Sequence, residues 1–145
     1  MSIESNKAVV RRYYDEVLNN GNLGALQEIA IADYDEHDPL PGQSNGRDGL
    51  RQRVEMLRGA LQPHFTLDDL IAEDDKVVVR WTNRGALVGP LFGMPPNGKP
   101  FAIAGIDIHL LRDGKMAEHW HVVDQLTMLQ QLGMLPSPDP APTGA

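Results

Sequence analysis

The sequence contains no cysteine, and this absence excludes disulfide bonds, thiolate metal ligands and cysteine nucleophiles together. It is also short of basic residues, since 13 Lys and Arg stand against 20 Asp and Glu and give a formal net charge of −7. Proteins that bind nucleic acids gather Lys and Arg against the phosphates, whereas the basic residues here are scattered along the chain. We therefore expect no nucleic-acid partner.

Long apolar runs are absent as well. No stretch is long enough to span a bilayer, and the first residues lack the apolar core of a signal peptide. We therefore expect no membrane partner and a cytoplasmic location. The 145 residues, of which 41% are hydrophobic and 23% charged, have the composition of a globular protein. They predict a single domain over residues 1–135, followed by a flexible proline-rich tail over residues 136–145.

The spacing of apolar residues changes from helical to alternating along the chain. Helical spacing predicts three helices, over residues 5–19, 23–30 and 48–61. Residues 34–42 read as a loop or a short strand because two prolines interrupt them. Alternation predicts four strands, over residues 66–72, 76–87, 101–111 and 115–123. This order predicts an α+β fold in which three N-terminal helices pack on one face of a curved antiparallel sheet.

The last predicted hairpin suggests which side chains share a face. A two-residue turn at Asp113-Gly114 pairs Arg112 with Lys115, and counting back from it pairs Asp107 with Trp120. Because side chains alternate along a strand, one face is expected to carry Asp107, His109, Trp120 and Asp124. His119 and His121 then fall on the opposite face, unless a bulge intervenes.

The spacing of His119 and His121 could ligate a metal ion from a strand. The expected register supplies no third protein ligand, because the neighbours on that face are Ile106, Ile108 and Val123. We therefore expect no metal, and we expect the two histidines to be buried where the sheets of two subunits meet.

Asp124 lies where the last strand gives way to a helix predicted over residues 125–132. Beside Trp120, Val122 and Val123 it could sit at the mouth of an apolar pocket. Burial there would raise the pKa of the carboxyl toward neutrality and make it a competent base. The alternative is a helix N-cap, whose hydrogen bonds would lower the pKa instead. The residues alone leave both interpretations open.

Four segments in a fixed order resemble a known family. They are Val9-Val-Arg-Arg-Tyr-Tyr with its exit Asn19-Asn-Gly-Asn; His37-Asp-Pro followed by Gly46-Arg-Asp-Gly-Leu; Gly89-Pro-Leu-Phe-Gly-Met-Pro-Pro-Asn-Gly-Lys-Pro; and Gly105-Ile-Asp-Ile-His-Leu-Leu-Arg-Asp-Gly-Lys-Met-Ala-Glu-His-Trp. Together they resemble the SnoaL-like polyketide cyclases of the nuclear transport factor 2-like superfamily. The resemblance implies a cone-shaped α+β barrel with a deep apolar pocket, assembled as a homodimer or homotetramer.

The same resemblance implies an activity. Cyclases of this family close the last ring of an aromatic polyketide by an intramolecular aldol reaction, without metal or cofactor. Their acid/base aspartate carries over to Asp124, and a pocket histidine carries over to His109. The expected substrate is a small hydrophobic polycyclic compound or ketone. Relatives of this fold include hydroxylases, isomerases and epoxide hydrolases, so a related reaction, or hydrophobic-ligand binding without catalysis, stays an alternative.

Five further residues are expected to bind the substrate. Trp120 offers a flat apolar wall, and Asp107 either lines the pocket with His109 or forms a satisfied polar pair with it. Tyr14, like Tyr13, belongs to the core by its periodicity, and one of the two hydroxyls could reach the cavity. Arg53 either faces the pocket or is solvated, and His37 either shapes a turn or closes the pocket.

Overall fold

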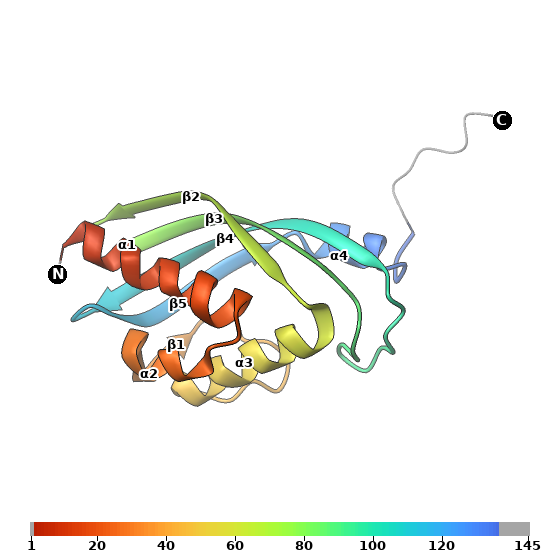
Figure 1. Cartoon of the computed structure of the whole chain (residues 1–145), viewed down its shortest axis with the longest axis horizontal. Coiled ribbons are helices and arrows are strands. Elements are labelled where there is room, and N and C mark those ends of the chain that lie inside the picture. Colours follow the sequence, from red (N-terminus) through yellow and green to blue (C-terminus); the bar gives the residue numbers. More distant parts are fainter. Residues whose placement is uncertain (1, 137–145) are drawn as a thin grey trace.

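The centre of the fold is a five-stranded sheet that curves around the helices (Figure 1). The structure is a computed structural model that describes residues 2–136. The strands lie in the order β1-β5-β4-β3-β2. Their bounds are β1 Ala30–Glu36, β2 His64–Glu73, β3 Lys76–Ala86, β4 Pro100–Arg112 and β5 Lys115–Val123. The α+β architecture expected from the sequence is confirmed.

One expectation about the sheet is wrong. β2 to β5 form the predicted antiparallel meander, but β1 pairs with β5 in parallel, so the sheet is mixed. β1 begins at Ala30, where the sequence predicts the end of a helix, and it ends within the segment for which the sequence predicts a loop or a short strand. The chain then crosses over through a long helix before it re-enters the sheet, as a parallel arrangement requires.

The helices precede and follow the meander. They are α1 Ile3–Arg12, the π-helix η1 Tyr13–Asn19, the short 3₁₀-helix η2 Leu23–Ala25, α2 Leu26–Ile29, α3 Gly46–Leu61 and α4 Gln125–Gln131. In Figure 1, α1 and α3 lie on the same side of the sheet. The predicted first helix therefore starts two residues earlier than expected and changes to π-helical turns at Tyr13. Tyr13 and Tyr14, the first two residues of the π-helix, are both buried.

A β-bulge in β5 decides the geometry of the site. The turn at Asp113-Gly114 has positive φ at both residues and pairs Arg112 with Lys115, as predicted. Beyond it the register shifts: Leu111 pairs with Met116, whereas Leu110 pairs with Glu118. Ala117 is the extra residue.

The register expected for the rest of the hairpin is therefore wrong by one position. Asp107 pairs with His121, and His109 pairs with His119. A slip of one residue moves a strand's side chains to the other face. His119 and His121 accordingly join Asp107 and His109 on the inner face of the sheet, and Trp120 turns to the outer face.

Along β3 and β4, buried residues on the inner face alternate strictly with more exposed residues on the outer face. In β4 every second residue from Phe101 to Leu111 is buried, and in β3 the buried positions run from Val77 to Asn83. These residues face the helices and close the core between the two layers. Asp107, His109 and Asn83 are the polar members of this row, and each is buried.

Two expectations concern the ends of the chain and its surroundings. Apart from residue 136, the tail predicted over residues 136–145 lies outside the described residues. Over residues 2–136, no helix has both the length and the apolar character that crossing a membrane requires.

Candidate active site

An apolar cavity opens between the inner face of the sheet and the helices η1 and α3. The empty space between its walls amounts to about 700 Å³ when the open solvent at its mouth is included. Its walls are mostly apolar and include Leu18, Leu57, Leu61, Phe65, Trp81 and Ile103.

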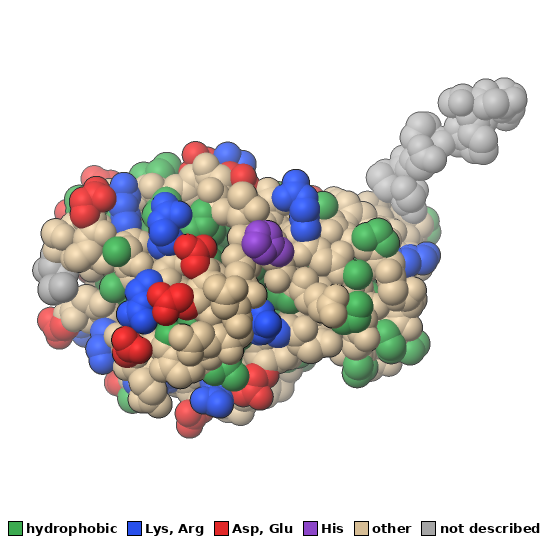
Figure 2. All heavy atoms as spheres, viewed as in Figure 1, with side chains coloured by type: hydrophobic (Ala, Val, Ile, Leu, Met, Phe, Trp, Pro, Cys, Tyr) green, Lys and Arg blue, Asp and Glu red, His purple; other side chains and the backbone are tan. Residues whose placement is uncertain are grey.

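The two ends of the cavity differ. The most exposed lining residues are Phe92, in the β3–β4 loop, and Gln125, at the start of α4, so the mouth lies between these two segments. Figure 2 shows hydrophobic side chains gathered at this end of the molecule. The other end is polar, and we call it the floor; it presents Asp107, His119, His121 and Arg53.

Asp107 is the centre of the floor. Its side chain is buried, and its Oδ2 atom accepts hydrogen bonds from the Tyr14 hydroxyl and from Trp81 Nε1 at 2.9 Å. Its Oδ1 atom lies 3.2 Å from His119 Nε2. Burial alone would raise the pKa of Asp107, but the charge and hydrogen bond of His119 outweigh it and hold the pKa well below its usual range. The side chain is therefore a carboxylate at neutral pH.

His119 is held between two carboxylates. Its Nδ1 atom is 2.8 Å from Glu36 on β1, and its Nε2 atom faces Asp107. Burial would lower the pKa of His119, but the two carboxylates raise it to about 9. The ring is therefore an imidazolium at neutral pH, and both of its N–H groups donate to a carboxylate.

His109 lies behind the floor and not in it. It is fully buried, and its Nε2 atom is 2.7 Å from the Tyr14 hydroxyl. Burial, followed by the charge of His119, lowers the pKa of His109 to about 3, so the ring is neutral. The Tyr14 hydroxyl donates a hydrogen bond to Asp107. Its oxygen can therefore only accept from His109, so His109 carries its proton on Nε2 and donates Nε2–H to Tyr14. Neither His109 nor Tyr14 lines the cavity, whereas Tyr13 does.

His121 lines the cavity, and within the described part of the chain only its Nδ1 atom has a side-chain partner. Arg53 Nη2 donates to its Nδ1 atom at 2.9 Å. Burial lowers the pKa of His121, and the charge of Arg53 lowers it further, so the ring is neutral. Since Nδ1 accepts a hydrogen bond, the neutral ring carries its proton on Nε2. His121 therefore offers an N–H donor to a molecule in the cavity.

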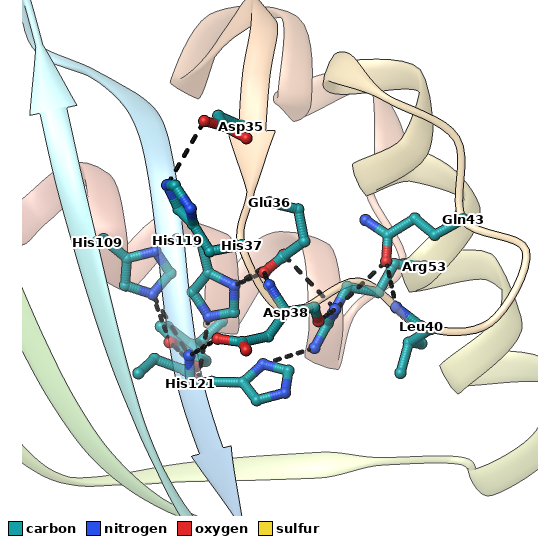
Figure 3. Close-up of polar contacts among 12 residues, drawn as sticks. Asp35, Glu36, His37, Asp38, Leu40, Gln43, Arg53, His109, His119 and His121 are labelled. Atoms are coloured by element: carbon teal, nitrogen blue, oxygen red, sulfur yellow. Dashed lines mark hydrogen bonds and ion pairs between the residues drawn. The ribbon is translucent and has the colours of Figure 1, made fainter.

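The charges of the floor balance one another. Arg53 Nη1 lies 3.5 Å from Glu36 Oε1, so the Arg53 and His119 cations face the Glu36 and Asp107 carboxylates. Figure 3 shows His119 joined to Glu36 and His121 joined to Arg53. Buried ionic groups persist when each has a partner of opposite charge, and that condition is met here.

The same groups must be considered as metal ligands. Donor atoms of Glu36, His119 and His121 lie within 4.8 Å of one another, so Glu36 supplies the third ligand that the sequence did not predict. The guanidinium of Arg53, however, contacts both Glu36 and His121. A metal ion would have to displace that cation and take the proton from His119. The cluster therefore suits an ion-pair network better than a metal ion.

Asp124 lies outside the cavity lining. Its side chain is exposed, and its Oδ1 atom accepts a hydrogen bond from the Thr127 amide at 3.1 Å, which caps α4. The expected burial of Asp124 is wrong, and the N-cap interpretation is confirmed. The catalytic role that the resemblance implies for Asp124 stays a prediction, without a contact to the cavity that would support it.

The remaining expected site residues divide between the cavity and the outer surface. Arg53 and Asp107 line the cavity. Trp120 and His37 do not: their rings stack on each other with centroids 4.4 Å apart, and His37 Nε2 lies 2.9 Å from Glu118. The expectation that His119 and His121 lie at a contact between subunits is wrong, because both face the cavity.

Sequence reasoning missed Trp81 and Asn83, which line the cavity, and Glu36, which contacts His119 and Arg53 next to it. One signal for Trp81 was present in the sequence. Gly105 lies inside β4, and a Cβ atom there would lie 2.2 Å from the Trp81 ring. A glycine inside a strand often marks such a close approach. Here it lets the indole cross β4 and reach Asp107.

Comparisons with known proteins agree with this architecture. The family model of the SnoaL-like polyketide cyclases matches residues 8–132. TsrD from Streptomyces laurentii is 32% identical with a TM-score of 0.85, over 93% of this chain and 99% of that chain. IdmH from Streptomyces antibioticus, a proposed polyketide cyclase, is 28% identical with a TM-score of 0.77, over 88% and 98%. A proposed polyketide cyclase from Bacillus cereus is 26% identical with a TM-score of 0.77, over 90% and 82%. No curated protein gives a significant match.

Proposed function

We propose that this chain, which belongs to the SnoaL-like polyketide cyclase family, closes a ring in a polyketide-like ketone by an intramolecular aldol reaction at the floor of its cavity. The family membership confirms the resemblance seen in the sequence. One observation carries the proposal: a carboxylate and a neutral imidazole N–H stand side by side at the closed end of an apolar cavity. Asp107 and His121 are direct cross-strand partners, so their side chains are neighbours on one face.

Asp107 is the proton acceptor in this proposal. It is the one carboxylate in the cavity lining over the described part of the chain. The low pKa that His119 imposes makes it a weak base. A weak base is effective only toward an acidic carbon. The substrate we propose therefore has its reacting carbon between two carbonyl groups, as in a β-keto ester or a β-diketone.

His121 is the group that stabilises the developing charge. When the proton leaves the carbon, negative charge moves to the carbonyl oxygen and forms an enolate. The Nε2–H of His121 donates a hydrogen bond to that oxygen, and the Arg53 cation behind the ring strengthens the donor. A neutral imidazole can fill this role because it keeps its proton and still polarises the carbonyl.

The ring then closes without any further reagent. The enolate carbon attacks a second carbonyl of the same molecule, a carbon–carbon bond forms, and Asp107 returns its proton to the new alkoxide. Substrate and product are isomers, the enzyme is regenerated, and no electron is gained or lost, so the proposed step needs no cofactor. The apolar walls fold the substrate so that the two carbons meet, an effect that can supply several kcal/mol of the barrier reduction.

The residues around Asp107 hold its carboxylate in place. Tyr14 and Trp81 bind one carboxylate oxygen, and His119 binds the other. These contacts orient the carboxylate and keep it ionised. We assign His109 to the same task, since it reaches Asp107 through the Tyr14 hydroxyl.

Product analysis tests this function directly. The enzyme would be incubated with aromatic β-keto esters that carry a second carbonyl within reach of the α-carbon, in water labelled with ¹⁸O and under ¹⁸O₂ in separate runs. Cyclisation predicts a product with the mass of the substrate, a new tertiary alcohol and no label beyond that of exchanging carbonyls. A product that gains oxygen from O₂ would show a hydroxylase, and one that gains water would show a hydrolase. Bound but unchanged substrate would show a binding protein.

We also propose that the chain forms a homodimer or homotetramer through the outer face of its sheet. This face exposes Ile71, Ile106 and Val122, of which Val122 is 76% exposed. Ile106 and Val122 are cross-strand partners and form one apolar patch. Light scattering would compare wild type with Val122→Lys, which should shift toward the monomer mass while the fold stays intact. An unchanged mass would contradict this interface.

A further inference from the structure

Asn83 is a buried polar residue that the reaction does not use. Its side chain is 4% exposed and lines the cavity, yet its Oδ1 atom is buried and has no hydrogen-bond partner among residues 2–136. Its cross-strand neighbours, Phe65 on β2 and Ile103 on β4, are apolar. A buried amide without a partner destabilises the fold, and a leucine of similar size would avoid that cost. The amide is therefore better explained by a ligand than by packing.

The position of Asn83 fixes where on the ligand it would act. On β3, Val79 stands opposite Asp107, and Asn83 lies four residues farther along the same inner face, toward the mouth. At the rise of a strand this separation is about 13 Å. The Trp81 ring lies between the two levels and gives a flat apolar wall. The two polar points are thus spaced for an elongated, flat molecule with a polar atom at each end.

The chemistry of the Asn83 amide limits which functional group the ligand can carry at the end near the mouth. Asn83 offers one acceptor oxygen and one donor NH₂ group. A hydroxyl group both donates and accepts, so it can satisfy the orphaned Oδ1 atom, which a carbonyl or ether oxygen cannot do. Either orientation of the amide pairs with a hydroxyl, which makes this match independent of how the two amide atoms are assigned.

We propose that Asn83 is a specificity-determining residue that recognises the hydroxyl group at the far end of an elongated aromatic substrate whose other end reacts at Asp107. This inference rests on the proposed function for the identity of the reacting end, and it adds the substrate class: polycyclic ketones with a phenolic hydroxyl opposite the reacting carbonyls.

Binding measurements with two probes test the proposal without catalysis. The probes are 2,6-dihydroxyanthraquinone, with a hydroxyl at each end, and 2-hydroxyanthraquinone, with one. Wild type should bind the dihydroxy probe about tenfold more tightly, the effect of one added hydrogen bond. In Asn83→Leu this ratio should fall to about one, and thermal stability without ligand should rise, because a buried unpaired polar atom has been removed.

Two further variants keep the test decisive. Asn83→Ala removes the amide without adding bulk and should also lose the discrimination, so the test does not depend on whether leucine fits. Ile103→Val trims the neighbouring wall and should change both affinities by the same factor. An equal affinity of wild type for both probes, a ratio that survives both Asn83 variants, or no binding of the dihydroxy probe up to its solubility limit would overturn the proposal. Discrimination without any ring closure would uphold the Asn83 site and overturn only the proposed reaction.

Discussion

Asp107 and Asp124 show how differently one residue type is used at two places on the same hairpin. Asp107 is buried and is contacted by Tyr14, Trp81 and His119. Asp124 is exposed, and within the described residues its side chain accepts one hydrogen bond, from the backbone of the helix that it caps. The surroundings decide what a carboxylate can do, because charge partners and burial set its pKa and its access to a ligand. The comparison assigns a chemical role to Asp107 in the floor and a structural role to Asp124, which lies where β5 ends and α4 begins.

Loss of the cation between the two buried carboxylates is expected to break this comparison most strongly. His119→Leu would leave Glu36 and Asp107 without that cation, which costs about 3–5 kcal/mol when a buried pair is broken. Urea denaturation should show this loss, and activity should vanish. His37→Leu removes an exposed histidine from the outer surface and should cost about 1 kcal/mol or less. A His119→Leu variant with wild-type stability would contradict the ion pairs of the floor.

The role of His121 gives the next largest effect. His121→Phe removes the donor to the developing oxyanion and should lower kcat by about 10²–10³-fold. Since burial lowers the pKa of His121, the ring keeps one protonation state through neutral pH, and wild-type activity should stay level there. The matched control is His37→Gln on the outer surface, which should leave kcat unchanged. Equal losses in both variants would contradict the assignment.

The ion pairs of His119 predict an unusual pH dependence of stability. The pKa of His119 is raised to about 9 in the folded state from the ordinary value of 6.5. The stability it contributes is therefore fully present below pH 6.5 and is lost as the pH rises toward 9, by up to about 3 kcal/mol. Urea denaturation across this range should show a falling free energy of unfolding. His119→Gln should flatten the slope, whereas a wild-type free energy that stays level would contradict the network.

The smallest effect on stability and turnover is expected at Asp124, where β5 ends and α4 begins. Asp124→Ala removes the cap of α4 and should cost about 1 kcal/mol of stability. Turnover should stay within about twofold of wild type, because α4 contributes to the mouth of the cavity and not to the floor. A large loss of turnover at unchanged stability would restore the catalytic role that the resemblance implies for Asp124.

The sequence predicted the fold well because the signals for it were local. Apolar spacing located the helices and the meander, and Asp113-Gly114 located the hairpin turn with the correct pairing of Arg112 and Lys115. The parallel pairing of β1 was missed because it depends on a crossover that no local pattern records. A parallel edge strand has no turn of its own in the sequence to reveal it.

The site was predicted only in part, for one physical reason. Asp107 and Arg53 were expected near the ligand and do line the cavity. His119, His121 and Trp120 were assigned to the wrong faces because one extra residue, Ala117, reverses the alternation that follows it. Small apolar residues such as Ala117 give no warning of a bulge. Glu36 was missed because it reaches the floor from β1, which is far away in the sequence.

Hydrogen exchange at carbon tests the central claim most directly. The α-protons of ethyl benzoylacetate, an aromatic β-keto ester, would be followed by NMR in D₂O at a pH where uncatalysed exchange is slow. Three proteins would be compared after circular dichroism has shown that each is folded. If Asp107 is the proton acceptor, wild type and Asp124→Asn accelerate exchange equally, and Asp107→Asn falls to the rate without enzyme. Exchange that survives in Asp107→Asn and disappears in Asp124→Asn would contradict the account.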